Sequence, residues 1–160
     1  MSINSYRFIH SFNINEWNCG FGESMKVMSR KLSISTNRQF ELINITGSVE
    51  RVVRENNVKN GLCVVYTMHT TAAIIINEDE TGLKEDVIKT VYDLFKPGSG
   101  WKHDYVDRNA HSHLSSIYLG PAKVIPVING RLGLGTWQQI FFVELDGPRS
   151  RSYYVTIIGE

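Results

Sequence analysis

The sequence is poor in cysteine, with only Cys19 and Cys63 among its 160 residues. The two cysteines are far apart and form no Cys-x-x-Cys pair, so we expect reduced thiols. No run approaches the roughly 18 apolar residues of a membrane span. The first ten residues also lack the basic-then-apolar pattern of a signal peptide. Together these absences predict a cytoplasmic protein with no membrane partner.

An excess of charge of either sign is also missing. The formal net charge is +1, from 17 lysines and arginines and 16 aspartates and glutamates. This balance gives no reason to expect a nucleic-acid partner. Apolar residues make up 42% of the chain and charged residues 21%, as in ordinary globular proteins. The length suits one core, and we find no linker or repeat, so we predict a single domain over residues 1–160.

Strand patterns outnumber helix patterns along the chain. Residues 30–35 read as a strand, and the very apolar, β-branched stretch 62–77 reads as one long central strand or two strands joined at a kink. Helical spacing of apolar residues predicts two main helices, over residues 44–57 and 83–95. The Gly- and Asp-rich stretch 97–109 is the one loose segment, and a long polar loop of this kind is often functional.

The last fifty residues complete the expected fold. A short helix is predicted near residues 110–116, and strands follow on both sides of an Asn129-Gly130 hairpin turn. The whole pattern predicts a strand-rich α+β domain with the two main helices packed on the sheet.

His69 and the pair Asn77-Glu78 are the first candidate site residues. In a straight strand, His69 and Asn77 are about 26 Å apart, so they cannot share a site within one chain. Either the strand bends or two subunits bring these ends together. The ordinary alternatives are a hydrogen-bonded structural histidine at position 69 and, for Asp79 and Glu80, a helix N-terminus whose dipole favours carboxylates.

Three further histidines lie in the loose segment and the short helix after it. On a helix the rings of His111 and His113 project about 200° apart, so at most one of them faces a site. We favour His113, beside the apolar Leu114, and expect His111 to be exposed to solvent. His69, His103 and His113 together predict a site for a divalent metal, zinc or magnesium, although none has the spacing of an established metal motif.

Two polar stretches near the C-terminus are candidates for binding a phosphorylated substrate. Glycines in the segment 130–139 would let backbone N–H groups approach a phosphate, but no helix follows, so a hairpin with bulges is favoured. Arg149 and Arg151, beside a turn, would clamp an anion or simply be solvated.

Three segments together resemble the YjbQ-like family: HTTAAIIINEDE, HSHLSSIYLG and NGRLGLGTWQQIFFVELDGPRSR. The resemblance covers residues 30–160, and its most specific part is the Gly-Thr-Trp-Gln stretch. It implies a homotrimer of a compact α+β fold. Most members have no established function, and they are commonly given the role of secondary thiamine-phosphate synthase.

The resemblance also implies functional positions. His69, Glu78 and His113 would be catalytic, and Asn77 and Ser116, with Thr136 and Gln138 of the Gly-Thr-Trp-Gln stretch, would bind substrate. His103-Asp104 matches the family's His-Asp-Tyr motif. Other members read Asn-Glu-Asn-x-Asp-Pro where this chain reads Asn-Glu-Asp-Glu-Thr-Gly, so the acidic residues after Glu78 are aligned less securely. A trimer would allow a site that combines His69 of one subunit with Glu78 of another.

Three functions therefore compete. The first is a metal-assisted transferase of the thiamine-phosphate synthase type, which joins a pyrimidine diphosphate to a thiazole phosphate. The second is a metal-dependent hydrolase of unknown substrate, which histidine ligands suit better, because magnesium with diphosphate prefers carboxylates. The third is a trimeric binding protein without catalysis. The expected partner is a small-molecule substrate that carries phosphate.

Overall fold

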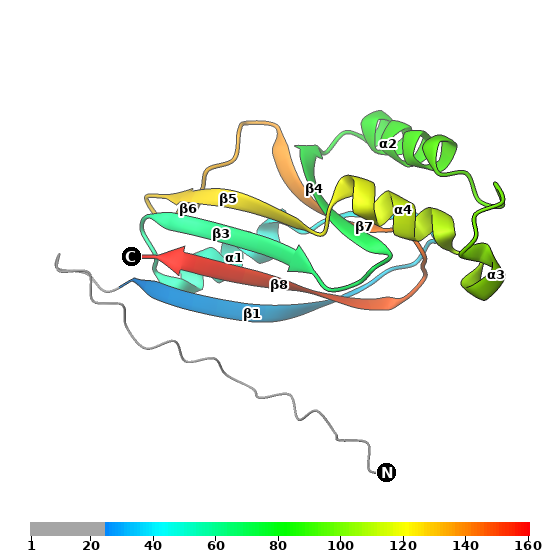
Figure 1. Ribbon diagram of the computed structural model, residues 1–160. Helices are drawn as coiled ribbons and strands as arrows, with labels where there is room; N and C mark the ends of the chain where they lie inside the picture. Colours follow the sequence, from blue (N-terminus) through cyan, green and yellow to red (C-terminus); the bar gives the residue numbers. More distant parts are fainter. Residues whose placement is uncertain (1–24) are drawn as a thin grey trace, which may run out of the picture.

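The computed structural model describes residues 25–160, which form two antiparallel sheets and four helices (Figure 1). In spatial order, sheet A contains β1 (Lys26–Ser35), β8 (Ser150–Gly159), β3 (Gly61–Thr67), β5 (Ala122–Ile128) and β6 (Arg131–Leu132). Sheet B contains β2 (Glu41–Asn44), β7 (Gln138–Glu144) and β4 (Ala72–Glu78). The helices are α1 (Thr46–Asn56), α2 (Thr81–Leu94), α3 (Asp104–Asp107) and α4 (Ala110–Leu119).

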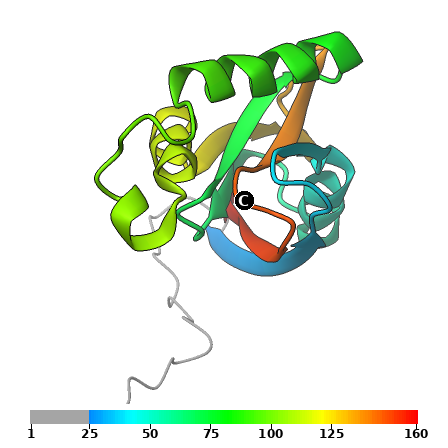
Figure 2. The same ribbon diagram turned by 90° about the vertical axis from the view of Figure 1, so that its right-hand side faces the viewer.

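The main core lies between the inner face of sheet A, sheet B and α1. Helix α1 contributes Val49, Val52 and Val53, which recur at the spacing of one helix face and are all buried. The helix ends where Asn57 adopts a left-handed conformation, with φ of 51°. In Figures 1 and 2, α1 lies on one side of the molecule, and α2 and α4 lie near sheet B on the other.

Sheet B is covered on both faces, and β7 shows this most clearly. Ile140 and Phe142 point into the main core, whereas Val143 and the following Leu145 belong to a second apolar cluster with Val91 of α2. A strand buried on both faces needs a continuous apolar run instead of an alternating one. This explains the sequence Ile-Phe-Phe-Val at residues 140–143.

The outer face of sheet A is different, because no helix or strand of residues 25–160 covers it in Figures 1 and 2. Large apolar side chains lie on it with 40% or more of their surface exposed. They include Val27 of β1, Leu62 and Tyr66 of β3, and Val124 and Ile128 of β5.

The predicted strand-rich α+β class is confirmed, and the two predicted main helices correspond to α1 and α2. The stretch 62–77 is two strands, as the second alternative proposed, but they belong to different sheets. Residues 68–71 form the turn between them, so the 26 Å estimate for a straight strand does not apply. The loose segment 97–109 contains the short helix α3, and the short strands β2 and β6 were not predicted.

Within residues 25–160, no helix is both long enough and apolar enough to cross a membrane. Cys63 is buried and has no disulfide partner among the described residues, and its burial raises the pKa of the thiol to about 12, which keeps it protonated. The expectation for Cys19 falls outside the described residues.

Candidate functional site

A pocket of about 320 Å³ lies where the turn between β3 and β4 meets α4. His69 and Thr70 of the turn line one side, and His113 and Ser116 of α4 line the other. Pro121, just before β5, closes one end. Three of the predicted site residues, His69, His113 and Ser116, therefore meet in one pocket, at the low end of the size range of small-molecule sites.

His69 is held in a defined orientation by sheet A. Its Nε2 accepts a hydrogen bond of 3.0 Å from the backbone N–H of Ser152 in β8. Burial, and then the positive charge of Arg151, lower the pKa of His69 below its usual value. The ring is therefore neutral at pH 7, and because Nε2 is an acceptor, the proton is on Nδ1. His69 is thus a hydrogen-bond donor in this pocket.

His113 lines this pocket. Residues 110–119 form a helix there, as predicted for residues 110–116. The ring centroid of His113 is 4.8 Å from that of His103, which immediately precedes α3. Asp104 accepts a hydrogen bond of 3.0 Å from the N–H of Ala110 and so ties α3 to the start of α4. This bond helps to bring His103 of the loose segment beside the pocket. The three histidines predicted to cooperate therefore lie in one region.

Helix α4 is fixed to sheet B by two serine hydroxyls. Ser116 Oγ donates to the carbonyl of Ala72 at 2.7 Å, and Ser112 Oγ donates to the carbonyl of Leu145 at 2.6 Å. The two serines are four residues apart and therefore lie on one face of the helix. Ser116 is buried and its proton is used by Ala72, so in this arrangement it positions α4 and can offer a ligand only an acceptor.

The expectation that His111 is exposed to solvent is wrong. His111 is 3% exposed, lies against the ring of Phe40 with centroids 5.8 Å apart, and has no hydrogen-bond partner at either ring nitrogen within residues 25–160. It faces the second apolar cluster because it lies on the buried side of α4. Burial lowers the pKa of His111, although Asp104 and Asp146 act in the opposite direction. The ring is therefore neutral.

Behind His69 lies a buried ion pair. Glu144 at the end of β7 is fully buried, and Arg151 of β8 is 8% exposed. Arg151 donates from Nε and Nη2 to the two carboxylate oxygens at 2.7 and 2.6 Å, and from Nη2 to Thr71 at 2.9 Å. Burial raises the pKa of Glu144, but the bonds from Arg151, Asp146 and Thr36 outweigh burial and leave it lowered. The pair is therefore ionised, and it joins the two sheets beside the pocket.

This pairing changes the interpretation of the two arginines. The guanidinium of Arg151 is occupied by Glu144 and Thr71, so it does not present a charge to a substrate. Arg149 is exposed and binds the carbonyl and carboxylate of Asp146 at 2.7 and 2.8 Å. Because both guanidiniums already have carboxylate partners, the expected clamp of two arginines around an anion is not formed in this arrangement.

The remaining predicted site residues gather at the opposite end of sheet B. Asn77 and Glu78 end β4 and are paired with Gln139 and Gln138 of β7, while Thr136 lies in the loop before β7. All except Gln139 are exposed, as is the adjacent Trp137 at 70%. A seven-residue strand spans about 20 Å, so this end is remote from His69 within one chain. Glu80, as the helix alternative predicted, caps α2 by accepting from the N–H groups of Gly82 and Leu83.

A three-histidine metal site does not fit the present side-chain positions. Across the part of the chain that the structure describes, no group of three His, Cys, Asp or Glu side chains is arranged to hold a metal ion. The physical reason is His69, because a metal ligand needs a nitrogen lone pair. The lone pair on Nε2 is directed at the N–H of Ser152, and Nδ1 carries the proton.

Sequence reasoning missed Glu144 and the backbone of Ser152. Glu144 had a detectable signal, because it is the one charge in the apolar run 140–145 and a buried charge requires a partner. The Ser152 N–H carries no signal at all, since a backbone donor is independent of residue type.

The fold and the site together define a small α+β protein with a histidine-lined pocket and an open apolar sheet face. The profile of the family described as UPF0047 protein YjbQ-like matches residues 30–160. The chain belongs to this family, as its resemblance indicated.

Relatives of similar length support this membership. A UPF0047 protein of Archaeoglobus fulgidus is 47% identical over 125 residues, covering 78% of this chain and 97% of the relative. One of Methanothermobacter thermautotrophicus is 41% identical over 139 residues, covering 87% and 97%. The crystal structure of a YbjQ-like protein of unknown function from Sulfolobus solfataricus P2 has a TM-score of 0.84 and 48% identity, covering 85% of this chain and 99% of that one.

Proposed function

We propose that the pocket between His69 and His113 is the active site of an enzyme that acts on a small phosphorylated molecule by acid–base catalysis. The observation that carries the proposal is the hydrogen bond from Ser152 N–H to His69 Nε2. It fixes the ring and its tautomer, as positioned partners do for catalytic histidines. The lowered pKa of His69 keeps it neutral at pH 7.

In this proposal His69 donates from Nδ1 to an oxygen of the substrate on which negative charge develops. A preorganised donor in a partly dehydrated pocket stabilises such charge more than water does. His113, on the facing wall, supplies a second imidazole that can accept or deliver a proton. Arg151 acts indirectly, because its charge helps to keep His69 neutral.

Hydrolysis suits this pocket better than thiamine-phosphate synthesis. A departing diphosphate needs cations to stabilise its charge. The residues that line the pocket include neither lysine nor arginine, and Arg151 behind it is paired with Glu144. The synthase reaction therefore remains the second candidate, and it would require a metal to supply the positive charge.

The test is a screen of purified protein against phosphate monoesters and diesters, with thiamine phosphate formation measured in parallel. His69→Gln is the sharpest variant, because the Gln oxygen can replace Nε2 as acceptor for Ser152, whereas Gln cannot titrate. We expect it to fold normally and to lose at least 100-fold in kcat, within the range for general acid–base groups. His111→Gln, outside the pocket, controls for loss of a histidine. Equal activity of His69→Gln and the wild-type protein would refute the proposal.

We propose that a divalent metal binds to two of the three predicted histidines. His103 and His113 have ring centroids 4.8 Å apart. We expect added zinc to bind through these two rings, more weakly than in a closed site of four ligands. Calorimetry should show binding abolished by His113→Ala and kept by His69→Ala. Loss of binding in His69→Ala would instead support the three-histidine site.

We further propose that the protein is a homotrimer assembled through the open face of sheet A. A contiguous apolar patch of this kind is rare on monomers and typical of subunit contacts. Light scattering should give about three times the chain mass of 18.2 kDa. Val124→Glu on this face is expected to give monomers, whereas Lys96→Glu, exposed elsewhere, is expected to leave the trimer intact. A monomeric wild-type protein would contradict the proposal.

A trimer would also allow the two groups of predicted residues to meet. We propose that the Asn77-Glu78 end of one subunit lies beside the His69 pocket of another. The test uses Thr70→Cys and Glu78→Cys in one chain, cross-linked with a short bismaleimide. Because these positions lie at opposite ends of β4, efficient cross-linking between chains requires contact between subunits. Yields no higher than those of the two variants that carry only Thr70→Cys or only Glu78→Cys would argue against a shared site.

A further inference from the structure

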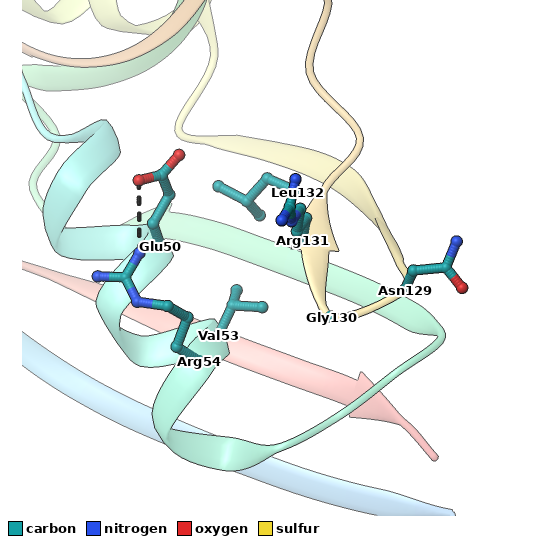
Figure 3. A pocket seen from close by; sticks show the side chains of 7 residues that line it. All are labelled: Glu50, Val53, Arg54, Asn129, Gly130, Arg131 and Leu132. Atoms are coloured by element: carbon teal, nitrogen blue, oxygen red, sulfur yellow. Dashed lines mark ion pairs between the residues drawn. The ribbon is translucent and has the colours of Figure 1, made fainter.

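A second and larger hollow, of about 510 Å³, lies between α1 and the hairpin of β5 and β6. Figure 3 shows Glu50, Val53 and Arg54 of α1 on one side and Arg131 and Leu132 of β6 on the other. An adjoining hollow of about 290 Å³ shares Val53 and Arg54. We call the two together the α1–β6 groove.

The α1–β6 groove is separate from the histidine pocket. Pro121, at the start of β5, lines the pocket, whereas Asn129, after the end of β5, lines the groove. These two residues are eight positions apart along the strand, a distance of about 26 Å. A ligand in one site therefore cannot touch the other within the same chain.

The groove contains guanidinium groups on both walls. Arg131 is exposed, and its side chain makes no ion pair with residues 25–160. Arg54 is 3.7 Å from Glu50, but both side chains are about half exposed, so this pair is weak. Guanidinium forks match phosphate oxygens in geometry and charge. The groove therefore has one guanidinium without an ion pair in residues 25–160 and one weakly paired guanidinium, on its two walls.

The two walls are held in place before any ligand binds. Asn129 and Gly130 form the hairpin turn with φ of 50° and 75°, a conformation that favours Asn-Gly. Gly130 N–H donates to the carbonyl of Lys59 at 2.8 Å, and Asn129 N–H donates to Asn60 Oδ1 at 3.3 Å. These bonds tie the hairpin to the loop after α1, so the backbone that carries Arg131 is braced and only side chains have to be ordered on binding.

Leu132 supplies the accessible apolar surface of the groove. It is half-buried and packs against the main core, of which Val53, at 1% exposed, is a member. An apolar body would rest on Leu132 while its charged group meets the guanidiniums. Two acidic residues weaken the attraction of the groove for a phosphate. Glu50 lines the groove, and Glu160 lies against the loop at Lys59.

We infer that the α1–β6 groove is a second binding site, for a small molecule with a phosphate group attached to an apolar body. The phosphate binds between Arg54 and Arg131, and the apolar part lies on Leu132. Glu50 competes with the phosphate for Arg54. The site is distinct from the proposed active site and does not depend on the function proposed there.

The test is a titration of the full chain with phenyl phosphate, followed by amide NMR on deuterated protein. We expect shifts at Asn129, Gly130 and Arg131 and near Arg54, and none around His69. Arg131→Gln should weaken binding about tenfold, which is the loss of about 1.4 kcal/mol, whereas Glu50→Gln should tighten it. Arg38→Gln, an exposed arginine outside the groove, should change it less than twofold.

Three outcomes would overturn the inference. The first is no binding at millimolar phenyl phosphate. The second is a set of shifts confined to the histidine pocket, which would support the proposed active site and refute the second site. The third is equal weakening by Arg131→Gln and Arg38→Gln, which would reveal nonspecific attraction of the anion. Tighter binding in Glu50→Gln cannot arise from unfolding, so that variant keeps the test informative if the arginine variants are unstable.

Discussion

The buried pair of Glu144 and Arg151 gives the sharpest prediction about stability. The carboxylate accepts five hydrogen bonds, from the N–H groups of Leu145 and Asp146, from Nε and Nη2 of Arg151, and from Thr36. Glu144→Gln keeps the shape but removes the negative charge and leaves the Arg151 charge buried without a counter-ion. Breaking such a pair costs about 3–5 kcal/mol. For a chain of this length that corresponds to a fall of about 6–20 °C in Tm.

The assay is urea unfolding followed by circular dichroism, at one fixed protein concentration because subunit association contributes to stability. Glu50→Gln, which breaks an exposed pair, is the matched control and should cost less than about 0.5 kcal/mol. The double variant Glu144→Leu with Arg151→Met should recover most of the loss, because no charge remains buried. A cost below about 1 kcal/mol for Glu144→Gln would refute the reasoning.

Three other predictions concern the pocket and its surroundings. Folding lowers the pKa values of His69 and His111, so the unfolded chain binds more protons than the folded chain below about pH 6.5. The free energy of unfolding should therefore fall as the pH is lowered below that value, by up to about 1.4 kcal/mol per pH unit for each histidine. Urea midpoints measured from pH 8 to pH 5 test this, and a flat profile would contradict it. His111→Leu removes two buried ring nitrogens that have no hydrogen-bond partner in residues 25–160, and it should raise the free energy of unfolding by about 1 kcal/mol or more at pH 7. A lower free energy of unfolding would mean that the ring of His111 has a hydrogen-bond partner. Ser116→Ala should cost about 1 kcal/mol by removing the bond to Ala72, and no measurable cost would show that this bond does not hold α4.

The sequence predicted the elements better than it predicted their assembly. Helices α1 and α2 were found because their apolar residues follow a helical period, and the Asn129-Gly130 turn because its residues favour positive φ. The strands β3 and β4 looked continuous because both are buried and apolar. Their assignment to different sheets depends on contacts with β8 and β7, which are distant in sequence.

The same limit applies to the candidate site. Helical geometry predicted that His111 and His113 point in different directions. It did not predict that His111 is buried, because the surface that covers it includes Phe40, seventy residues earlier in the sequence. The state of His69 depends on a backbone N–H of β8, and no residue pattern identifies such a donor. Arg151 looked like a substrate ligand because its partner Glu144 lies in a different strand.

The two serines of α4 have a consequence for how the pocket works. Ser112 and Ser116 bind carbonyls at the ends of two neighbouring strands, so the helix can neither roll nor slide along sheet B without breaking both bonds. Helix α4, which carries His113, is therefore a rigid side of the pocket and not a mobile lid. Any adjustment of the pocket to a ligand is then left to the other side, where Met68 and Thr70 are exposed in a short turn.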